Sequence, residues 1–383
     1  MKLIARTLYG LEQVLADELV SLGAKGVSAA NRAVIFEGSK SLLYLVNYSS
    51  ATALSFLVPL AEFNIRTKDD LYNGCLKIHW NDYLKNDSTF TVVPVVNSPL
   101  FKHTGFPALV VKDSIADYFR KKTGRRPSVD ALNPDIVVNL HVSNQKVTVS
   151  LDSTVIPLYK RGYRTEQTIA PVNEVLAAGI LRLTRWNRQS LLIDPMCGSG
   201  TIPIEAAMLA SGMPAGRYRS FFGFQKWQDY DENLFREIRL KEEEKIRKTD
   251  IKIQASDISN EAVGYARSNI KRAGVGELIE LNTADFKDIK PVSAEGVLVM
   301  NPPYGQRITP EDIDSLYSMI GTTLKHNFSG FNAWILSANR EALKNVGLKT
   351  ASRHILFNGA LECMLAGYEL YTGSRKAAGK STM

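Results

Sequence analysis

From about residue 165 onward, short apolar segments alternate with segments of helical periodicity, and this alternation limits the fold more than any other feature of the chain. The predicted strands are Leu191–Asp194, Ile251–Ser256, Leu278–Asn282, Gly296–Met300 and Phe331–Ser337. The helices predicted between them span Thr201–Ala210, Ser259–Arg272 and Pro310–Lys325. Strands that alternate with helices form a parallel sheet covered by helices on both faces. The sequence therefore predicts an α/β domain of the doubly wound, Rossmann-like class over residues 165–373.

The N-terminal part of the 383-residue chain has a different pattern, as expected for a chain too long for one typical core. Residues 1–60 predict a small α+β unit with strands Leu3–Arg6 and Ala33–Glu37. Residues 61–155 predict a second α+β unit, with a helix start at Thr67, an extended Thr89–Val96, a helix Pro107–Lys122 and a hairpin of Asp135–Val142 and Lys146–Leu151. We interpret residues 156–164 as a linker and the polar residues 374–383 as a disordered tail.

The composition is typical of a globular protein, with 45% hydrophobic and 22% charged residues. The longest weakly polar run, Ala51–Ala61, is about half of the ~20 residues that a membrane-spanning helix requires. Acidic residues interrupt the N-terminal segment where a signal peptide would be apolar, so we expect a cytoplasmic protein. The three cysteines are widely spaced and do not suggest a disulfide framework or a metal site.

A formal net charge of +8 suits a polyanionic partner. Two basic clusters contribute to it: Arg120, Lys121, Lys122, Arg125 and Arg126 form the first, and Lys160, Arg161 and Arg164 form the second. Each cluster either contacts nucleic-acid phosphates or is no more than a solvated surface.

The segment 212–250 interrupts the alternation of strands and helices. Its first part is aromatic and basic, and its last part predicts a charged helix. Two interpretations stay open, a substrate contact and a simple insertion.

A glycine-containing loop directly follows the first predicted strand of the α/β domain and leads into a helix, where a doubly wound fold places its ligands. The loop is Asp194-Pro195-Met196-Cys197-Gly198-Ser199-Gly200-Thr201. Its two glycines let the backbone approach a ligand closely, but it lacks the lysine of a P-loop and the third glycine of the dinucleotide fingerprint. An acidic residue at the head of the loop suits a cationic ligand. S-adenosylmethionine carries an ammonium and a sulfonium group, so the loop indicates this cofactor, and we interpret Cys197 as a packing residue beside it.

Two further aspartates follow the next predicted strands. Asp257 ends the second strand, about 20 residues beyond Asp194 once the segment 212–250 is left out, where a doubly wound fold binds ribose hydroxyls. Asp285 follows the third strand and is a candidate acceptor for the adenine amine. Each aspartate alone would be read as a turn or cap residue, but their order behind the glycine loop favours cofactor binding.

The motif Asn301-Pro302-Pro303-Tyr304 follows the strand Gly296–Met300. An exocyclic base amine is a poor nucleophile because its lone pair is delocalised into the ring. The Asn301 side-chain oxygen and the Pro302 carbonyl can accept its two N–H bonds, and the prolines keep this acceptor pair rigid. Tyr304 can stack on a base that has been taken out of its helix or loop. The motif therefore predicts methyl transfer to an exocyclic amine, without a covalent intermediate.

With these motifs the chain resembles the THUMP-domain RNA guanine-N2 methyltransferases, in particular the large-subunit rRNA enzymes. The resemblance covers roughly residues 1–373 and rests on the two motifs above, on Ile204-Glu205-Ala206-Ala207, on Gly305-Gln306-Arg307, on Arg161-Gly162-Tyr163-Arg164 and on Ala170-Pro171. It implies a ferredoxin-like domain, a THUMP RNA-binding domain and a class I methyltransferase domain. It also implies 23S rRNA as the partner, and Thr165 and Ile169 as further cofactor neighbours. A longer relative carries a second methyltransferase domain, so the resemblance here implies only the guanine-N2 activity.

Other functions remain open on the sequence alone. Relatives with the same domain order modify tRNA, and adenine-N6 DNA methyltransferases share the N-P-P-Y motif. A third alternative is an RNA-binding assembly factor without activity, although the intact motifs argue against it.

Overall fold

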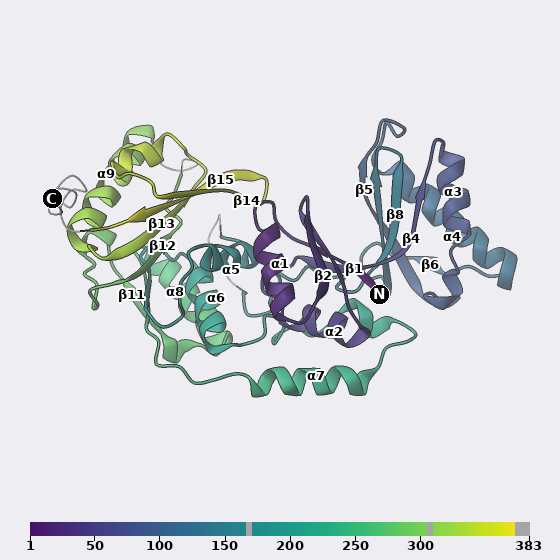
Figure 1. Cartoon of the computed structure of the whole chain (residues 1–383), viewed down its shortest axis with the longest axis horizontal. Helices are drawn as coiled ribbons and strands as arrows, with labels where there is room; N and C mark the ends of the chain where they lie inside the picture. The colour runs from purple at the N-terminus through teal and green to yellow at the C-terminus, as the bar shows by residue number, and fades with distance from the viewer. Residues whose placement is uncertain (166–170, 305–308, 372–383) are drawn as a thin grey trace, which may run out of the picture. The chain divides into compact units, whose positions relative to one another are not determined.

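The computed structural model describes residues 1–165, 171–304 and 309–371 (Figure 1). Contacts divide the chain into two compact units. The first contains residues 1–7, 15–158 and 219–241, and the second contains residues 8–14, 159–218 and 242–383. Each unit is built around one sheet.

The first unit begins with a β-α-β-β-α-β arrangement. Its elements are β1 (Lys2–Arg6), α1 (Glu12–Ser21), β2 (Lys25–Ala30), β3 (Ala33–Glu37), α2 (Lys40–Ser49) and β4 (Ser55–Asn64). The strand order β2-β3-β1-β4 with antiparallel pairing is that of a ferredoxin-like fold. The apolar run Ala51–Ala61 contributes to β4, and the proline inside it, Pro59, lies where the register of β4 against β8 shifts. A proline is tolerated in a strand at such an irregularity.

The same sheet continues through β4 into the following α+β part. This part contains α3 (Lys68–Leu76), β5 (Thr89–Asn97), α4 (Phe106–Thr123), β6 (Ser128–Val129), β7 (Ile136–Ser143) and β8 (Lys146–Asp152). The eight strands have the order β2-β3-β1-β4-β8-β7-β5-β6. Figure 1 shows α3 and α4 together on one side of these strands, and they cover a core that includes Leu71 and Ile115. The helix start predicted at Thr67 is confirmed, because Thr67 and Asp70 form a reciprocal capping box.

The segment 212–250 supplies part of the core of the first unit, which neither interpretation of the sequence anticipated. Its short helix η2 (Gly223–Lys226) and α7 (Glu232–Glu244) carry Phe224 and Phe235, which are buried together with Phe222. The Phe224 ring stacks on Tyr44 of α2 with 4.3 Å between the ring centroids. These buried rings pack inside the protein and are not available to a substrate.

The second unit is a doubly wound α/β domain. Its strands are β9 (Leu191–Asp194), β10 (Ile253–Asp257), β11 (Ile279–Thr283), β12 (Gly296–Met300), β13 (Phe331–Ser337), β14 (Ser352–Asn358) and β15 (Leu361–Glu369). Its α-helices, in the described residues, are α5 (Glu174–Leu183), α6 (Thr201–Ser211), α8 (Asn260–Arg272) and α9 (Pro310–Asn327). The strand order is β11-β10-β9-β12-β13-β15-β14, and β15 runs antiparallel to both of its neighbours, β13 and β14.

The direction of winding reverses between β9 and β12. The chain passes from β9 through β10 to β11 on one side, and then returns to β12 and β13 on the other. Ligands of doubly wound sheets bind outside the carboxyl ends of the strands at this point. A ligand is therefore expected to bind at the loops that follow Asp194 and Met300.

Candidate active site

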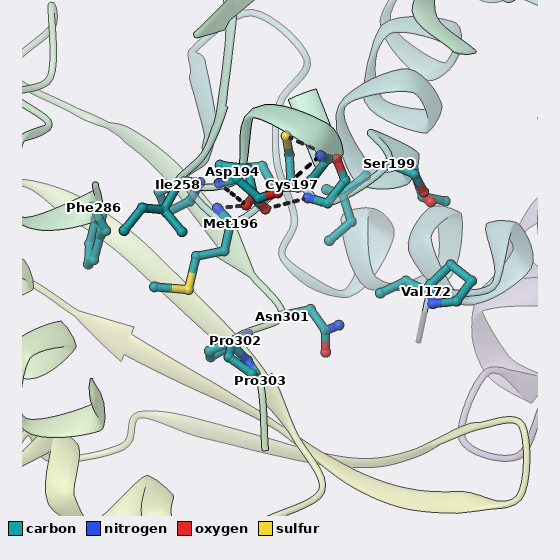
Figure 2. Close-up of a pocket in the computed structure, with 18 of the residues that line it drawn as sticks. Val172, Asp194, Met196, Cys197, Ser199, Ile258, Phe286, Asn301, Pro302 and Pro303 are labelled. Carbon is teal, nitrogen blue, oxygen red and sulfur yellow. Dashed lines mark hydrogen bonds between the residues drawn. The ribbon is translucent and has the colours of Figure 1, made fainter. Parts of the chain in front are cut away.

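A cavity of about 640 Å³ lies at the carboxyl ends of β9, β10, β11 and β12 (Figure 2). Among the residues named from the sequence, those that line it are Asp194, Met196, Cys197, Gly198, Ser199, Thr201, Asp257, Asp285, Asn301, Pro302, Pro303 and Tyr304. Figure 2 shows Asn301 and the two prolines across the pocket from the loop that carries Asp194 and Cys197. The structure thus brings the two predicted motifs together around one cavity.

The glycine loop needs its glycines for two different reasons. Gly198 and Gly200 both have left-handed backbone conformations, with φ of 54° and 84°. Gly200 does not line the cavity. It precedes α6, and a Cβ there would lie 3.2 Å from the Cβ of Ala266. Gly200 therefore sets the turn and the close packing of α8, whereas Gly198 forms part of the wall.

Asp194 is a buried carboxyl at the head of this loop, with one side-chain oxygen 3.3 Å from the Met196 N–H that donates to it. Burial raises the pKa of Asp194 well above its usual range, and the nearby Asp257 adds to the effect. Burial likewise raises the pKa of the Cys197 thiol, which stays neutral. A cation in the cavity would stabilise the charged form of Asp194.

The other two aspartates are held by local hydrogen bonds. Asp257 accepts from the N–H of Gly198 at 2.9 Å and from the N–H of Ser259 at 3.0 Å, so it connects the glycine loop to the start of α8. Asp285 pairs with the Lys287 ammonium at 2.9 Å, and this contact lowers the pKa of the Asp285 carboxyl. Both carboxyl groups also line the cavity.

Asn301 follows β12 and presents an unpaired acceptor. Its side-chain oxygen is buried and has no hydrogen-bond partner among the residues that the structure describes. A buried polar atom without a partner is costly, and the position of this one in the wall of the cavity makes it available to a ligand. Tyr304 is half-buried, and burial raises the pKa of its hydroxyl above the ordinary tyrosine value.

Two residues of the second basic cluster serve the domain's own structure, which corrects the prediction that they contact RNA. The Arg161 side chain has no exposed surface and pairs with Glu205 of α6 at 3.2 Å. Arg164 pairs with Glu174 at 3.2 Å and donates to the Val172 carbonyl and to the Thr201 hydroxyl. Lys160 is exposed, as are the five basic residues 120–126 of the first cluster.

The remaining cofactor predictions have different outcomes. Thr165 does not line the cavity, but its N–H donates to Asn269, whose side chain donates to the Ser199 carbonyl. Ile169 lies outside the described residues. Further wall residues were not predicted: Pro171, Val172, Pro195, Ile202, Ile258, Ser259, Glu261, Ala262, Tyr265, Ala284, Phe286, Leu316, Met319 and Leu361. Four of these had a sequence signal: Pro195 lies inside the glycine-containing loop, Pro171 belongs to the Ala170-Pro171 motif, and Ile258 and Phe286 each directly follow one of the strand-end aspartates.

Comparison with known proteins assigns the domains. Residues 161–366 match UPF0020, described as the RMKL-like methyltransferase domain. The chain belongs to this family. Residues 66–152 match the THUMP domain, and residues 2–54 match the RlmL ferredoxin-like domain. The predicted order of a ferredoxin-like, a THUMP and a class I methyltransferase domain is thereby confirmed.

Similar proteins extend over almost the whole chain. A Synechocystis protein named as a candidate RNA methyltransferase, slr0064, is 37% identical over 94% of this chain and 95% of its own length. The ribosomal RNA large subunit methyltransferase K/L of Psychromonas ingrahamii is 36% identical over 95% of this chain, which spans only 49% of that relative. The crystal structure of SMU.472, a candidate methyltransferase complexed with SAH, has a TM-score of 0.87 and 28% identity over 97% of this chain and 99% of its own.

This RMKL-like domain uses S-adenosylmethionine, and the cavity fits that cofactor. The buried Asp194 carboxyl offers a counter-charge for a cationic group of the cofactor, and the buried Ser199 hydroxyl has no partner among the described residues. In the same ranges, no group of three or more His, Cys, Asp or Glu side chains could hold a metal ion. None of the helices that the structure describes is long and apolar enough to cross a membrane.

Proposed function

We propose that this protein transfers a methyl group from S-adenosylmethionine to the N2 amine of a guanosine in RNA, and that the RNA is 23S rRNA. The observation that carries the proposal is the buried Asn301 oxygen, which lies in the same cavity as the glycine loop and has no partner in the part of the chain that the structure describes. An RNA substrate is supported by the THUMP domain and by relatives named as RNA methyltransferases. The large-subunit rRNA is supported by the names of the K/L relatives. A substrate of this kind would place the protein in the cytoplasm.

The chemistry follows from what the motif can do to an amine. S-adenosylmethionine, when bound, supplies an electrophilic methyl group on a sulfonium. The Asn301 oxygen and the Pro302 carbonyl accept the two N–H bonds of the amine, which directs the nitrogen lone pair away from the ring and fixes the nucleophile. The rigid Pro302–Pro303 pair keeps both acceptors in place. The nitrogen–carbon bond forms as the carbon–sulfur bond breaks, and the amine then releases a proton to water.

The cofactor contacts in this proposal are made by the loops after β9, β10 and β11. Asp194 is the counter-charge for a cationic group of the cofactor. Asp257 accepts from the ribose hydroxyls and Asp285 from the adenine amine. The remaining contacts come from Met196, Cys197, Gly198, Ser199 and Thr201. Gly200 and Thr165 act indirectly, through the shape of the loop.

RNA binding is proposed for the first basic cluster together with Lys160. Arg120, Lys121 and Lys122 end α4, and Arg125 and Arg126 follow it, so that cations gather at one exposed helix end. Such a cluster makes salt-dependent phosphate contacts. We also propose the domain boundaries 1–60, 61–155 and 165–373, with residues 156–164 as a linker.

The decisive experiment incubates the protein with labelled S-adenosylmethionine and with separate pools of unmodified 23S rRNA, tRNA and genomic DNA. The methylated nucleoside is then identified by mass spectrometry. We expect N2-methylguanosine in 23S rRNA. The same nucleoside in tRNA would retain the chemistry and change the substrate. N6-methyladenine in DNA would favour the second enzyme class that uses this motif, and no transfer to any pool would favour a binding protein.

A further inference from the structure

A second cavity adjoins the active site at Tyr304. It has a volume of about 590 Å³ and is lined by Tyr304, Ala338, Asn339, Arg340, Glu341, Leu361 and Glu362. Tyr304 and Leu361 also line the cofactor cavity. The volume of the second cavity falls within the range of about 300–1,000 Å³ that is typical of small-ligand pockets. Two ligand-sized spaces therefore share the aromatic residue proposed to stack on the target base.

The topology explains why three loops meet there. β12 and β13 are parallel neighbours, with Met300 opposite Ile335, so the loop after β13 lies beside the Asn301 loop. β15 is antiparallel to β13, with Ser337 opposite Met364, which brings the start of β15 to the same edge of the sheet. The second cavity is thus a consequence of the antiparallel strand β15.

The loop after β13 is firmly held, whereas its charged side chains can exchange partners. The Ser337 hydroxyl accepts from the Asn339 N–H at 3.1 Å, and the Asn339 side chain accepts from the Ala342 N–H at 3.0 Å. Arg340 forms an ion pair with Glu362, and the two side chains are 53% and 50% exposed. An exposed pair of this kind contributes little to stability, so it can give up its partner for a ligand.

We propose that this second cavity binds the nucleotide that adjoins the target guanosine in the RNA strand, with Arg340 and Glu362 contacting the edge of its base. This inference rests on the function proposed above and adds a determinant of sequence context. Asn301 lines only the first cavity, so the target base belongs there and its neighbour needs a separate site. A guanidinium beside a carboxylate offers donors and an acceptor together, which matches the edge of a base better than a phosphate. Enzymes that act on extruded bases take their context preference from such flanking contacts.

The test uses the full-length protein and a set of transcribed 23S rRNA fragments. Within the set, each nucleotide that flanks the methylated guanosine is changed in turn to the other three bases. We expect the wild-type protein to prefer particular flanking bases. Arg340→Ala and Glu362→Ala should lower kcat/KM for the preferred RNA by about tenfold or more and reduce the preference, with SAH affinity unchanged. Lys344→Ala is the matched control, because Lys344 is an exposed cation of the same loop that pairs with Glu341 and does not line the cavity.

Unchanged flanking-base preference in Arg340→Ala and Glu362→Ala would overturn the inference while leaving the proposed function intact. If the wild-type protein methylated no RNA, the proposed function and this inference would fail together. Should an alanine variant lose SAH affinity, Arg340→Lys and Glu362→Gln decide the matter, since they keep the side-chain volume but remove the guanidinium fork or the charge.

Discussion

At the level of single residues, the Asn301 oxygen, which has no partner within residues 1–165, 171–304 and 309–371, separates cofactor binding from the chemical step. Asn301→Ala removes an acceptor for the amine but none of the carboxyl groups that line the cofactor cavity. We therefore expect near-normal affinity for S-adenosylmethionine and a fall in kcat of about 10²–10³-fold, as for the loss of one orienting hydrogen bond. Calorimetry and single-turnover rates measure the two effects. Asn301→Asp, which keeps an acceptor oxygen, should lose less activity, and near-normal turnover in Asn301→Ala would remove the orienting role.

The raised pKa of Asp194 makes a prediction about pH. Burial keeps the Asp194 carboxyl protonated up to a higher pH than usual. At a pH below this raised pKa, a cationic ligand can pair with the carboxylate only if the carboxyl first loses its proton. Affinity for S-adenosylmethionine should therefore increase as the pH rises through the raised pKa, with a proton released on binding. Of the groups that face it, the Cys197 thiol stays neutral, and Asp257 is the carboxyl that adds to the raised pKa of Asp194. Calorimetry in buffers of different ionisation enthalpy detects the proton, and Asp194→Asn should abolish both effects. If the affinity of the wild-type protein for S-adenosylmethionine did not change with pH, Asp194 would not be the counter-charge for the cofactor.

How much of the site the sequence predicts depends on the kind of residue. Motif residues such as Asp194 and Asn301 were predicted because their positions after strands have a chemical meaning. Arg161 was misassigned because an arginine looks the same in a sequence whether it is exposed or paired inside the protein. Its partner, Glu205, is 44 residues away, and only the fold brings the two together.

At the level of elements, the buried pair of Arg161 and Glu205 fastens the segment before α5 to α6. Tyr163 also donates to Glu205 at 3.0 Å. Glu205→Ala would leave a buried guanidinium without its counter-charge, and we expect a loss of about 3–5 kcal/mol in the free energy of unfolding of the methyltransferase unit. Urea denaturation measures this loss. The double variant Arg161→Met with Glu205→Leu should recover most of it, whereas an equal loss in the double variant would mean that packing alone is responsible.

Helices and strands with a clear hydrophobic pattern were predicted well, whereas those without one were missed. β12 and β13 have the predicted bounds, because fully apolar strands between polar turns are distinctive. α2 and the hairpin of β14 and β15 were missed. The hairpin follows only a short 3₁₀ helix (Ala342–Val346) in the described residues, and its strands pair antiparallel, so the alternation that identified the other strands gives no signal for it. The second cavity could therefore not be predicted from the sequence, since β15, whose first residues line it, was not predicted.

For the whole molecule, the first unit depends on a segment from within the methyltransferase sequence. Phe224 has no exposed surface and stacks on Tyr44. Phe224→Ala should lower the free energy of unfolding of the first unit by about 3–5 kcal/mol, as for other buried aromatic truncations. Hydrogen exchange in β1–β4 reports the change, with exchange in β9–β13 as the internal reference. Tyr230→Ala, at a partly buried ring of the same cluster, should cost less. Equal protection in wild type and Phe224→Ala would show that the segment is only an insertion.

For the exposed basic cluster at residues 120–126, we predict an effect on RNA affinity that can be measured separately from methyl transfer. Lys121, Arg125 and Arg126 are exposed, and replacing all three by alanine should weaken RNA binding evenly across sequences. The slope of log affinity against log salt should fall by about one for each phosphate that the variant no longer neutralises. Filter binding at several salt concentrations measures the slope. SAH affinity is the control, and an unchanged slope would assign these residues to a solvated surface.

The three-segment composition of the first unit also sets a sequence of events during synthesis. Residues 219–241 leave the ribosome long after residue 158, when β9 and α6 of the other unit have already been translated. Domains usually fold from the N-terminus as they emerge. The aromatic core of the nascent first unit stays incomplete until Phe222, Phe224 and Phe235 have been translated. The first unit can therefore complete its folding only after the cofactor loop has also been translated.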